Sequence, residues 1–213
     1  FLNLHDMKTI SSLEGIQYLT NLQSLDVSTT SVSDLSPVKN SSLKRLDCRS
    51  SKVGSVDLTR YPNLEAFVCD NTSINSLDVS KNEKLNTLFA DSTSISNLDV
   101  TNNPNLEQLS CSNTGLMELD VTHNPQLVTL DIGDTKVKTL DISKNPNLKQ
   151  LSCYMTNIAE LDVTKNTKLT RLFCHDTTIK KLDLSNNLEL EMLRCGEIFE
   201  QGIRGLDISK NTK

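Results

Sequence analysis

The sequence predicts a solenoid in which one short parallel strand per turn builds a long sheet. Short extended or 3₁₀ segments form the opposite side, with little or no α-helix and shallow curvature. Three observations predict it: leucines recur every 21 residues, a second apolar residue follows each one three positions later, and a Leu-Asp-Val signature returns with the same period. Self-similarity at one fixed period is typical of repeat architectures.

The sheet is predicted from the first two rows. The first leucine row is Leu22, Leu43, Leu64, Leu85, Leu106, Leu127, Leu148, Leu169 and Leu190. The second apolar row is Leu25, Leu46, Phe67, Leu88, Leu109, Leu130, Leu151, Leu172 and Leu193. Apolar and polar residues alternate around the second row, as in a half-buried strand, and stacked strands lie ~4.8 Å apart.

The opposite wall is predicted from the Leu-Asp-Val signature. It stands at 77–79, 98–100 and 119–121, and in variant form at 140–142, 161–163, 182–184 and 206–208. Only 8 positions lead from Cys69 to Leu77, which is too few for a helix of average length. We therefore expect short extended or 3₁₀ segments on this side.

The whole unit, L-x-x-L-x-C-x-x-T-x-I-x-x-L-D-V, matches the leucine-rich-repeat template. In classification terms this is an α/β-class leucine-rich-repeat solenoid, here almost all-β. We expect one domain over 1–213 with about ten repeats: an irregular start at 1–42, regular 21-residue repeats at 43–189, and a last repeat at 190–213 lengthened by three residues. Because neither end shows the cap that a solenoid needs, we expect a fragment of a longer protein.

All six cysteines fall on one phase of the repeat: Cys48, Cys69, Cys111, Cys153, Cys174 and Cys195. Val27, Ala90 and Ile132 occupy the remaining rungs, which predicts a structural ladder of small buried side chains. Two alternatives stay open. A disulfide is disfavoured because stacked side chains do not naturally give the ~90° torsion, and a metal site because a linear row does not converge on one ion.

Three polar rows predict the turns. A hydroxyl row stands where such repeats usually carry Asn: Thr30, Ser51, Thr72, Thr93, Thr114, Thr135, Thr156 and Thr177. An asparagine row lies at another corner, where we expect it to close the turn: Asn82, Asn103, Asn124, Asn145, Asn166, Asn187 and Asn211. An aspartate row is expected to cap local N–H groups, with calcium binding as the less favoured alternative: Asp57, Asp78, Asp99, Asp120, Asp141, Asp162, Asp183 and Asp207.

The outward face of the predicted sheet is the candidate binding surface. Residue types enriched at protein interfaces gather there: Phe89, Tyr154, Met155, Arg171, Phe173, His175, Met192 and Arg194. A weaker group comprises Arg45, Asp47, Arg49, Val68 and Asp70. The alternative is that exposed Phe in strands reflects β-propensity and cross-strand pairing. The insertion at 196–202, with Phe199, is equally compatible with a binding protrusion and a neutral insertion.

Composition and motifs exclude several function classes. With 22 Lys and Arg against 27 Asp and Glu, the net charge is 22 − 27 = −5, which disfavours nucleic acid and anionic membranes as partners. No apolar run is long enough to insert into a membrane. The histidines, His5, His123 and His175, stand in different phases, and neither a nucleophile constellation nor a phosphate loop occurs. We therefore expect no enzyme activity, cofactor or metal.

The opening stretch from Ile10 to Leu22, followed by 32–38, resembles the leucine-rich repeats of bacterial internalins. The later L-x-C and L-D-V-S-x-N-P pattern resembles the members with 21-residue repeats and a cysteine row. The resemblance covers essentially the whole chain. It implies an exported Gram-positive surface protein, secreted or attached to the cell wall, whose repeats mediate adhesion to a host-surface protein or glycoprotein and contribute to virulence. We expect a monomer. The alternative is a spacer or targeting region that presents another domain.

Overall fold

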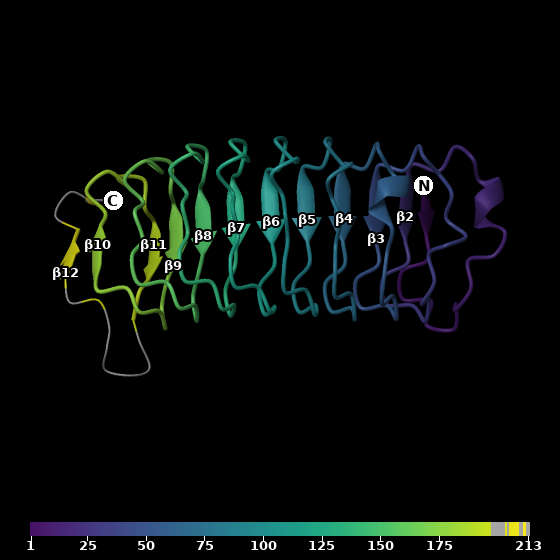
Figure 1. Cartoon of the computed structure of the whole chain (residues 1–213), viewed down its shortest axis with the longest axis horizontal. Helices are drawn as coiled ribbons and strands as arrows, with labels where there is room; N and C mark the ends of the chain where they lie inside the picture. Colours follow the sequence, from purple (N-terminus) through teal and green to yellow (C-terminus); the bar gives the residue numbers. More distant parts are fainter. Residues whose placement is uncertain (197–202, 204, 209–210, 212–213) are drawn as a thin grey trace.

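The chain folds into an elongated solenoid with one strand in each turn (Figure 1). The computed structural model describes residues 1–196, 203, 205–208 and 211. Ten parallel strands form the main sheet: β1 (Leu2–Asn3), β2 (Ser24–Asp26), β3 (Arg45–Asp47), β4 (Ala66–Val68), β5 (Thr87–Phe89), β6 (Gln108–Ser110), β7 (Thr129–Asp131), β8 (Gln150–Ser152), β9 (Arg171–Phe173) and β11 (Met192–Arg194). The predicted fold is confirmed.

The register of the sheet follows the repeat. Leu25 of β2 pairs with Leu46 of β3, and the pairing continues in steps of 21 residues to Leu172 of β9 and Leu193 of β11. At the N-terminal end, Leu2 of β1 pairs with Leu25 across a step of 23 residues. The second apolar row thus forms one line across the centre of the sheet.

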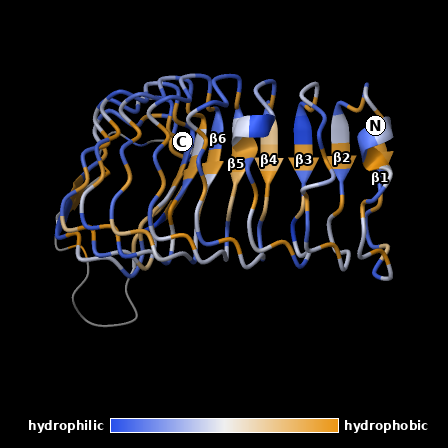
Figure 2. Cartoon of the chain, turned by 45° about the vertical axis from the view of Figure 1, so that its right-hand side comes forward, coloured by the Kyte–Doolittle hydropathy of each residue, from blue (hydrophilic) through white to orange (hydrophobic). Residues whose placement is uncertain are grey.

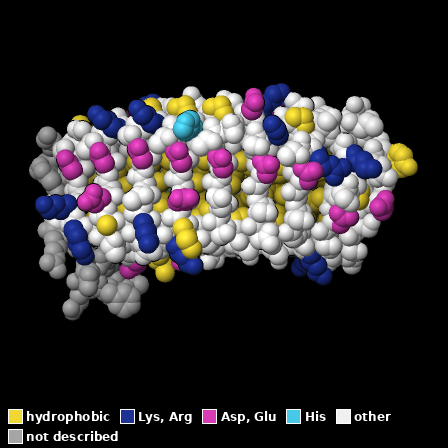
Figure 3. Space-filling model, viewed as in Figure 1, with side chains coloured by type: hydrophobic (Ala, Val, Ile, Leu, Met, Phe, Trp, Pro, Cys, Tyr) yellow, Lys and Arg dark blue, Asp and Glu magenta, His cyan; other side chains and the backbone are white. Residues whose placement is uncertain are grey.

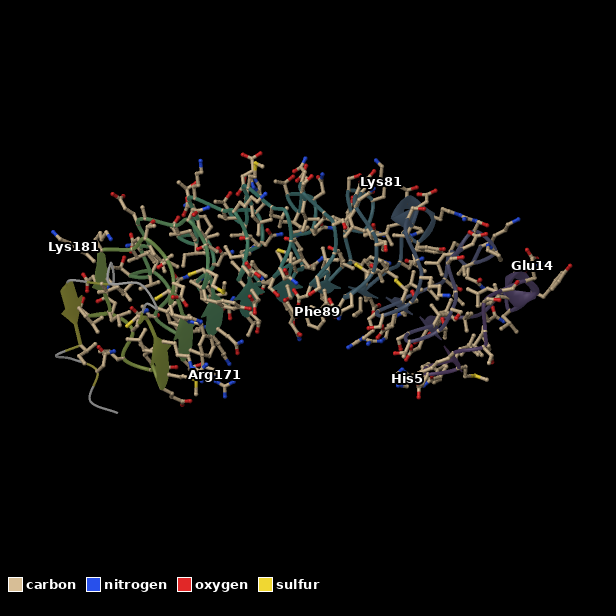
Figure 4. All side chains as sticks on the ribbon, turned by 90° about the horizontal axis from the view of Figure 1, so that it is seen from below. His5, Glu14, Lys81, Phe89, Arg171 and Lys181 are labelled. Carbon is tan, nitrogen blue, oxygen red and sulfur yellow. The ribbon has the colours of Figure 1, made fainter. Side chains whose placement is uncertain are left out.

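The opposite side consists mainly of extended segments. Two 3₁₀ turns occur, η1 (Ile16–Tyr18) and η2 (Leu58–Arg60), and the described residues contain no α-helix. A separate parallel pair joins β10 (Lys181–Asp183) to β12 (Gly205–Asp207). This agrees with the expected short extended and 3₁₀ segments. The solenoid bends gently, with the main sheet on its inner side (Figure 4).

The interior is filled by repeated aliphatic side chains. Most strands combine hydrophilic and hydrophobic residues (Figure 2), and the Leu25, Leu88 and Leu151 side chains at their centres are completely buried. Phe67 occupies the same row and is equally buried. Because every turn has a similar cross-section, one set of medium-sized side chains fills the core, which accounts for the aromatic content of only 4%.

The asparagine row is buried and joins consecutive repeats. The Asn103 Nδ2 donates to the backbone oxygens of Val79 at 3.0 Å and Asn82 at 2.9 Å, both in the preceding repeat. The same two bonds recur from Asn82 to Asn187. The sequence predicts that this row closes the turns. A backbone bond from Asn103 N–H to Val100 O closes the turn of Asn103 itself, and its side chain caps the turn of the preceding repeat.

The hydroxyl row acts mainly on carbonyl groups, and among the described residues only Thr30 and Ser51 also accept a long bond from a backbone amide two residues on. Each hydroxyl donates to the carbonyl oxygen three residues earlier, as from Thr72 to Cys69 at 2.6 Å and from Thr156 to Cys153 at 2.7 Å. The preceding residue adopts a positive φ, for example 55° at Asn71. A hydroxyl can donate one such bond, so Thr in place of Asn is sufficient at this corner.

The aspartate row caps local backbone amides, as predicted. The Oδ1 of Asp120 accepts from the N–H of Thr122 at 2.8 Å and from its hydroxyl at 2.7 Å. Such bonds lower the carboxyl pKa of the exposed members Asp78, Asp99, Asp120, Asp141 and Asp162. Figure 3 shows a straight line of acidic side chains along this face. Among the described residues, no three His, Cys, Asp or Glu side chains are grouped to hold a metal ion.

The cysteine row lies inside the solenoid. Cys48 to Cys174 are buried and Cys195 is half-buried, all with free thiols. Burial raises the pKa of the Cys174 thiol to about 12, and those of the other buried thiols as well. The Cys48 Sγ lies 3.5 Å from the carbonyl oxygen of Val68 in the next strand. The insertion from 197 to 202, including Phe199, lies outside the described residues.

Candidate functional site

The candidate site lies on the outward face of the main sheet. Three rows of side chains point outward from it: the residues before and after each buried leucine, and the residue two positions beyond the strand end. These rows place Phe89 on β5, Arg171 and Phe173 on β9, and Met192 and Arg194 on β11. Figure 4 shows Phe89 and Arg171 on the same long side of the solenoid, opposite Lys81 and Lys181.

Seven of the eight predicted residues gather on the last three strands of the main sheet and on the turns that follow β8 and β9. We call these seven the platform: Tyr154, Met155, Arg171, Phe173, His175, Met192 and Arg194. Phe89 lies four strands away from β9, roughly 19 Å at the usual strand spacing. Met155 lies on the turn after β8 with a φ of 51°, not on a strand, and is exposed at the rim.

The platform side chains hold one another in place. The Tyr154 and His175 rings are stacked, with centroids 5.0 Å apart and planes 6° from parallel. The guanidinium carbon of Arg194 lies 5.8 Å from the Phe173 ring centroid, within the range of a cation–π contact. These contacts restrict the rotamers of large half-exposed side chains, so a partner that binds them loses less conformational entropy.

A glycine provides the space in which Tyr154 lies. A Cβ atom built on Gly133 would collide with Cε1 and Cζ of Tyr154, so the ring lies directly over the backbone of the preceding repeat. The Tyr154 hydroxyl reaches Ser112, one repeat further toward the N-terminus. Gly133 and Ser112 were not among the predicted site residues. The signal in the sequence was that Gly133 occupies the same outward row as the aromatic residue Tyr154, one repeat earlier.

Gly133→Ala is expected to displace the Tyr154 ring and break its stack with His175. Gly133 has no positive φ, so alanine fits the backbone, and the added methyl group acts only on the ring. Loss of the NOE contacts between the two rings in an NMR spectrum measures the effect. Gly54→Ala is the matched control, because no heavy atom lies within 4 Å of a Cβ at that position. An intact stack in Gly133→Ala would contradict this geometry.

A line of carboxylates adjoins the platform. We call Asp70, Asp91 and Asp131 the carboxylate row; it runs from the turn after β4 to the end of β7. The Asp91 Oδ1 accepts from the Ser112 N–H at 2.7 Å and from the Ser110 hydroxyl at 2.6 Å. Burial raises the carboxyl pKa of Asp70 and Asp131. Among the described residues, no lysine or arginine forms an ion pair with these three carboxylates.

Asp131→Asn is expected to raise the unfolding temperature at pH 7. The raised pKa means that the ionised carboxylate is less favourable in the folded chain than in the unfolded one. As the pH falls through the folded pKa, protonation restores that stability, so the gain should vanish below the unfolded pKa of about 3.9. Thermal unfolding followed across this pH range measures it.

Asp141→Asn is the matched control for the pH dependence. Hydrogen bonds from Ser143 lower the Asp141 carboxyl pKa, so its charged form stabilises the fold above the unfolded pKa, and that stabilisation is lost as the pH falls through the folded pKa. The control should therefore lower the unfolding temperature at pH 7. If both substitutions changed the unfolding temperature at pH 7 in the same direction, the two carboxylates would not differ as the structure indicates.

The weaker predicted group is neutralised internally. Asp47 is almost completely buried, and its carboxylate accepts bonds from the Arg49 Nη2 at 2.7 Å and the Arg45 Nη2 at 3.2 Å. The side-chain hydrogen bond to Asp47 raises the pKa of the Arg49 guanidinium. Asp70 lies further along the same face, and Val68 is buried rather than exposed. Val68 occupies the outward row, in register with Asp47 and Phe89, so its predicted direction is right and only its expected exposure was wrong.

Solved structures provide the comparison with known proteins. The functional domain of InlJ from Listeria monocytogenes, described as including a cysteine ladder, matches with 26% identity and a TM-score of 0.59, over 96% of this chain and 59% of that one. The internalin InlF from Listeria monocytogenes matches with 22% identity and a TM-score of 0.81, over 95% and 61%. The chain has a leucine-rich-repeat fold.

The fold of this leucine-rich-repeat chain is also similar to that of a plant receptor ectodomain. The ectodomain of the Arabidopsis thaliana receptor kinase GASSHO1/SCHENGEN3, solved in complex with CASPARIAN STRIP INTEGRITY FACTOR 2, matches with 16% identity and a TM-score of 0.73, over 85% of this chain and 28% of that one. No known family model and no curated protein sequence matches. The leucine-rich-repeat chain spans about three fifths of the two Listeria structures. In its described part, no helix is long and apolar enough to cross a membrane.

Proposed function

We propose that this chain is a non-enzymatic protein-binding module of an exported bacterial surface protein. It recognises a host-surface protein or glycoprotein through the outward face of the main sheet, and it acts as a monomer. The observation that carries the proposal is the platform. Tyr, Phe and Arg side chains, which are enriched in protein interfaces, are held there by ring stacking and a cation–π contact on a regular sheet.

The comparisons support this proposal by analogy of fold. One matched leucine-rich-repeat structure, the plant receptor ectodomain, was solved in complex with CASPARIAN STRIP INTEGRITY FACTOR 2. Another is described by its cysteine ladder, and this chain carries a buried cysteine row. We infer from that shared feature a place among the internalins, at the surface of a Gram-positive cell. Repeat scaffolds commonly present their binding residues on the inner curved surface, where the platform lies.

The chemistry of the described residues also favours binding over catalysis. The thiols from Cys48 to Cys174 are buried, and their raised pKa values keep them protonated and unreactive at neutral pH. His5 contacts Ser28, and His123 lies 3.8 Å from Asp120 on the opposite face. The third histidine, His175, is stacked on Tyr154. The three histidines thus occupy separate parts of the solenoid.

Site-specific photo-cross-linking tests which face touches the partner. The photoreactive residue p-benzoylphenylalanine is placed at Gln150 on β8, the register partner of Arg171, or at exposed Glu160 on the opposite side. Each purified protein is irradiated on cultured human intestinal epithelial cells. We expect a cross-linked cell-surface protein from position 150 and none from position 160. Cross-linking only from position 160, or no retention on cells by either protein, would overturn the proposal.

A further inference from the structure

The outward face of the sheet divides into two regions of opposite charge. The carboxylate row occupies the turns and strands from β4 to β7, and Arg171 and Arg194 lie on β9 and β11. Tyr154, two residues after β8, lies between Asp131 and Arg171 along the solenoid, and its ring stacks on His175, two residues after β9. The charges are therefore arranged along the solenoid, at right angles to the strands, in the order negative, aromatic, positive.

These charges are not neutralised within the described part of the chain. Asp47, further toward the N-terminus, is an example of a neutralised carboxylate, because both Arg45 and Arg49 form ion pairs with it. No comparable ion pair forms at Asp91 or Asp131 among the described residues. The Asp131 carboxyl has a raised pKa because of its burial. A binding surface often retains such unfavourable groups because function requires them.

We propose that the face binds an extended peptide segment of the partner that crosses the strands and carries a basic and an acidic side chain four or six residues apart, with an apolar or aromatic residue between them. The inference rests on the proposed function and specifies its partner. The basic side chain contacts Asp91 and Asp131, and the acidic side chain contacts Arg171 and Arg194. The intermediate residue packs on Tyr154 and His175.

The spacing follows from the geometry of two extended chains. Asp131 and Arg171 lie on strands two steps apart in the sheet, and Asp91 and Arg194 belong to turns or strands five steps apart. At ~4.8 Å per step these separations are roughly 10 and 24 Å. In an extended peptide, side chains two residues apart point the same way and lie roughly 6.7 Å apart. Only separations of four or six residues, roughly 13 or 20 Å, place both charges on the sheet within this range.

Other ligand classes fit these charges less well. A neutral oligosaccharide would stack on the aromatic rings but would desolvate Asp91, Asp131 and the arginines without pairing them, which is costly. A nucleic acid would be repelled by the carboxylate row. A peptide with one charge of each sign compensates both regions. Either chain direction allows this pairing, because it depends only on the spacing of the two charges.

Selection from a displayed library of random 12-residue peptides tests the inference with the purified chain as bait. We expect enrichment of basic and acidic residues separated by four or six positions, at least fivefold over the unselected library. Affinity is then measured by fluorescence anisotropy on individual synthetic peptides with blocked ends. The Asp91→Asn/Asp131→Asn variant, which keeps the Oδ1 acceptors, should weaken binding at least tenfold.

Charge reversal sharpens the test. Asp91→Lys/Asp131→Lys should favour peptides whose basic residue is replaced by Glu, and Arg171→Glu/Arg194→Glu should favour peptides whose acidic residue is replaced by Lys. If a reversed variant fails to fold, the Asn variant decides. Glu118→Lys/Glu160→Lys is the matched control, because both exposed residues occupy the same repeat position on the opposite side; it should change affinity less than twofold.

The outcomes separate this inference from the proposed function. Enriched peptides that lack the charge pattern but lose binding in Tyr154→Ala/Phe173→Ala would overturn the charge pairing and leave the binding face intact. Peptides that bind equally well to that variant would overturn both. Failure to enrich any peptide overturns the peptide inference. So does binding of neutral mucin oligosaccharides that depends on the aromatic residues but not on Asp91 and Asp131.

Discussion

Asn124→Ala is expected to lower the free energy of unfolding by about 2–4 kcal/mol. The side chain is completely buried, and its Nδ2 donates to the backbone oxygens of Val100 at 2.9 Å and Asn103 at 2.8 Å. Alanine removes both bonds and leaves a cavity at the junction of two repeats. Each carbonyl keeps a backbone partner, Asn103 N–H for Val100 and Leu106 N–H for Asn103, which limits the cost. Chemical denaturation followed by circular dichroism measures the change.

Asn147→Ala is the matched control for the asparagine row. Its Nδ2 donates one bond of 3.3 Å to the Pro125 oxygen, and its Oδ1 accepts one of 2.7 Å from the Lys168 Nζ, both in exposed surroundings. The expected change is within about 0.5 kcal/mol, as for most surface substitutions. Equal destabilisation by the two variants would show that the buried row does not join the repeats as the structure indicates.

The fold could be predicted from the sequence because one rung defines all the others. Once the apolar residues at Leu46, Phe67 and Leu88 share one phase, the parallel register follows. The step of 8 positions from Cys69 to Leu77 is too short for a helix of average length on the opposite side. The bonds of the Asn103 side chain could not be predicted in this way. The repeat gives the corner at which Asn lies, but the direction of its amide depends on the carbonyl groups of the neighbouring turn.

The site could be predicted only in part. The phase of the repeat correctly puts Arg171 and Phe173 on the outward side of β9. It does not show that Tyr154 leans across the strands over Gly133, because that requires a neighbour without a side chain. It also assigned Val68 to the surface, although the structure buries it. Contacts along the solenoid axis therefore decide which outward residues act together.

Replacing Tyr154 and Phe173 with alanine and Arg171 with glutamate is expected to weaken binding to the partner at least 100-fold, or about 2.7 kcal/mol. Tyr and Arg at the centre of an interface often cost about 2 kcal/mol or more each when truncated, although such losses do not simply add. All three side chains are half-buried or exposed on the sheet, so the solenoid core stays intact. Flow cytometry of labelled protein on epithelial cells measures the half-saturating concentration.

The most direct test of the binding face compares that triple variant with Glu118→Ala/Glu160→Ala, whose changes lie on the opposite side. Both proteins are first shown by circular dichroism and thermal unfolding to retain the solenoid. Half-saturating concentrations on intestinal epithelial cells are then measured side by side with the unmodified chain. The half-saturating concentration is expected to rise at least 100-fold for the triple variant and to change less than twofold for the control. Unchanged binding by a folded triple variant would contradict the assignment of the sheet face as the binding surface.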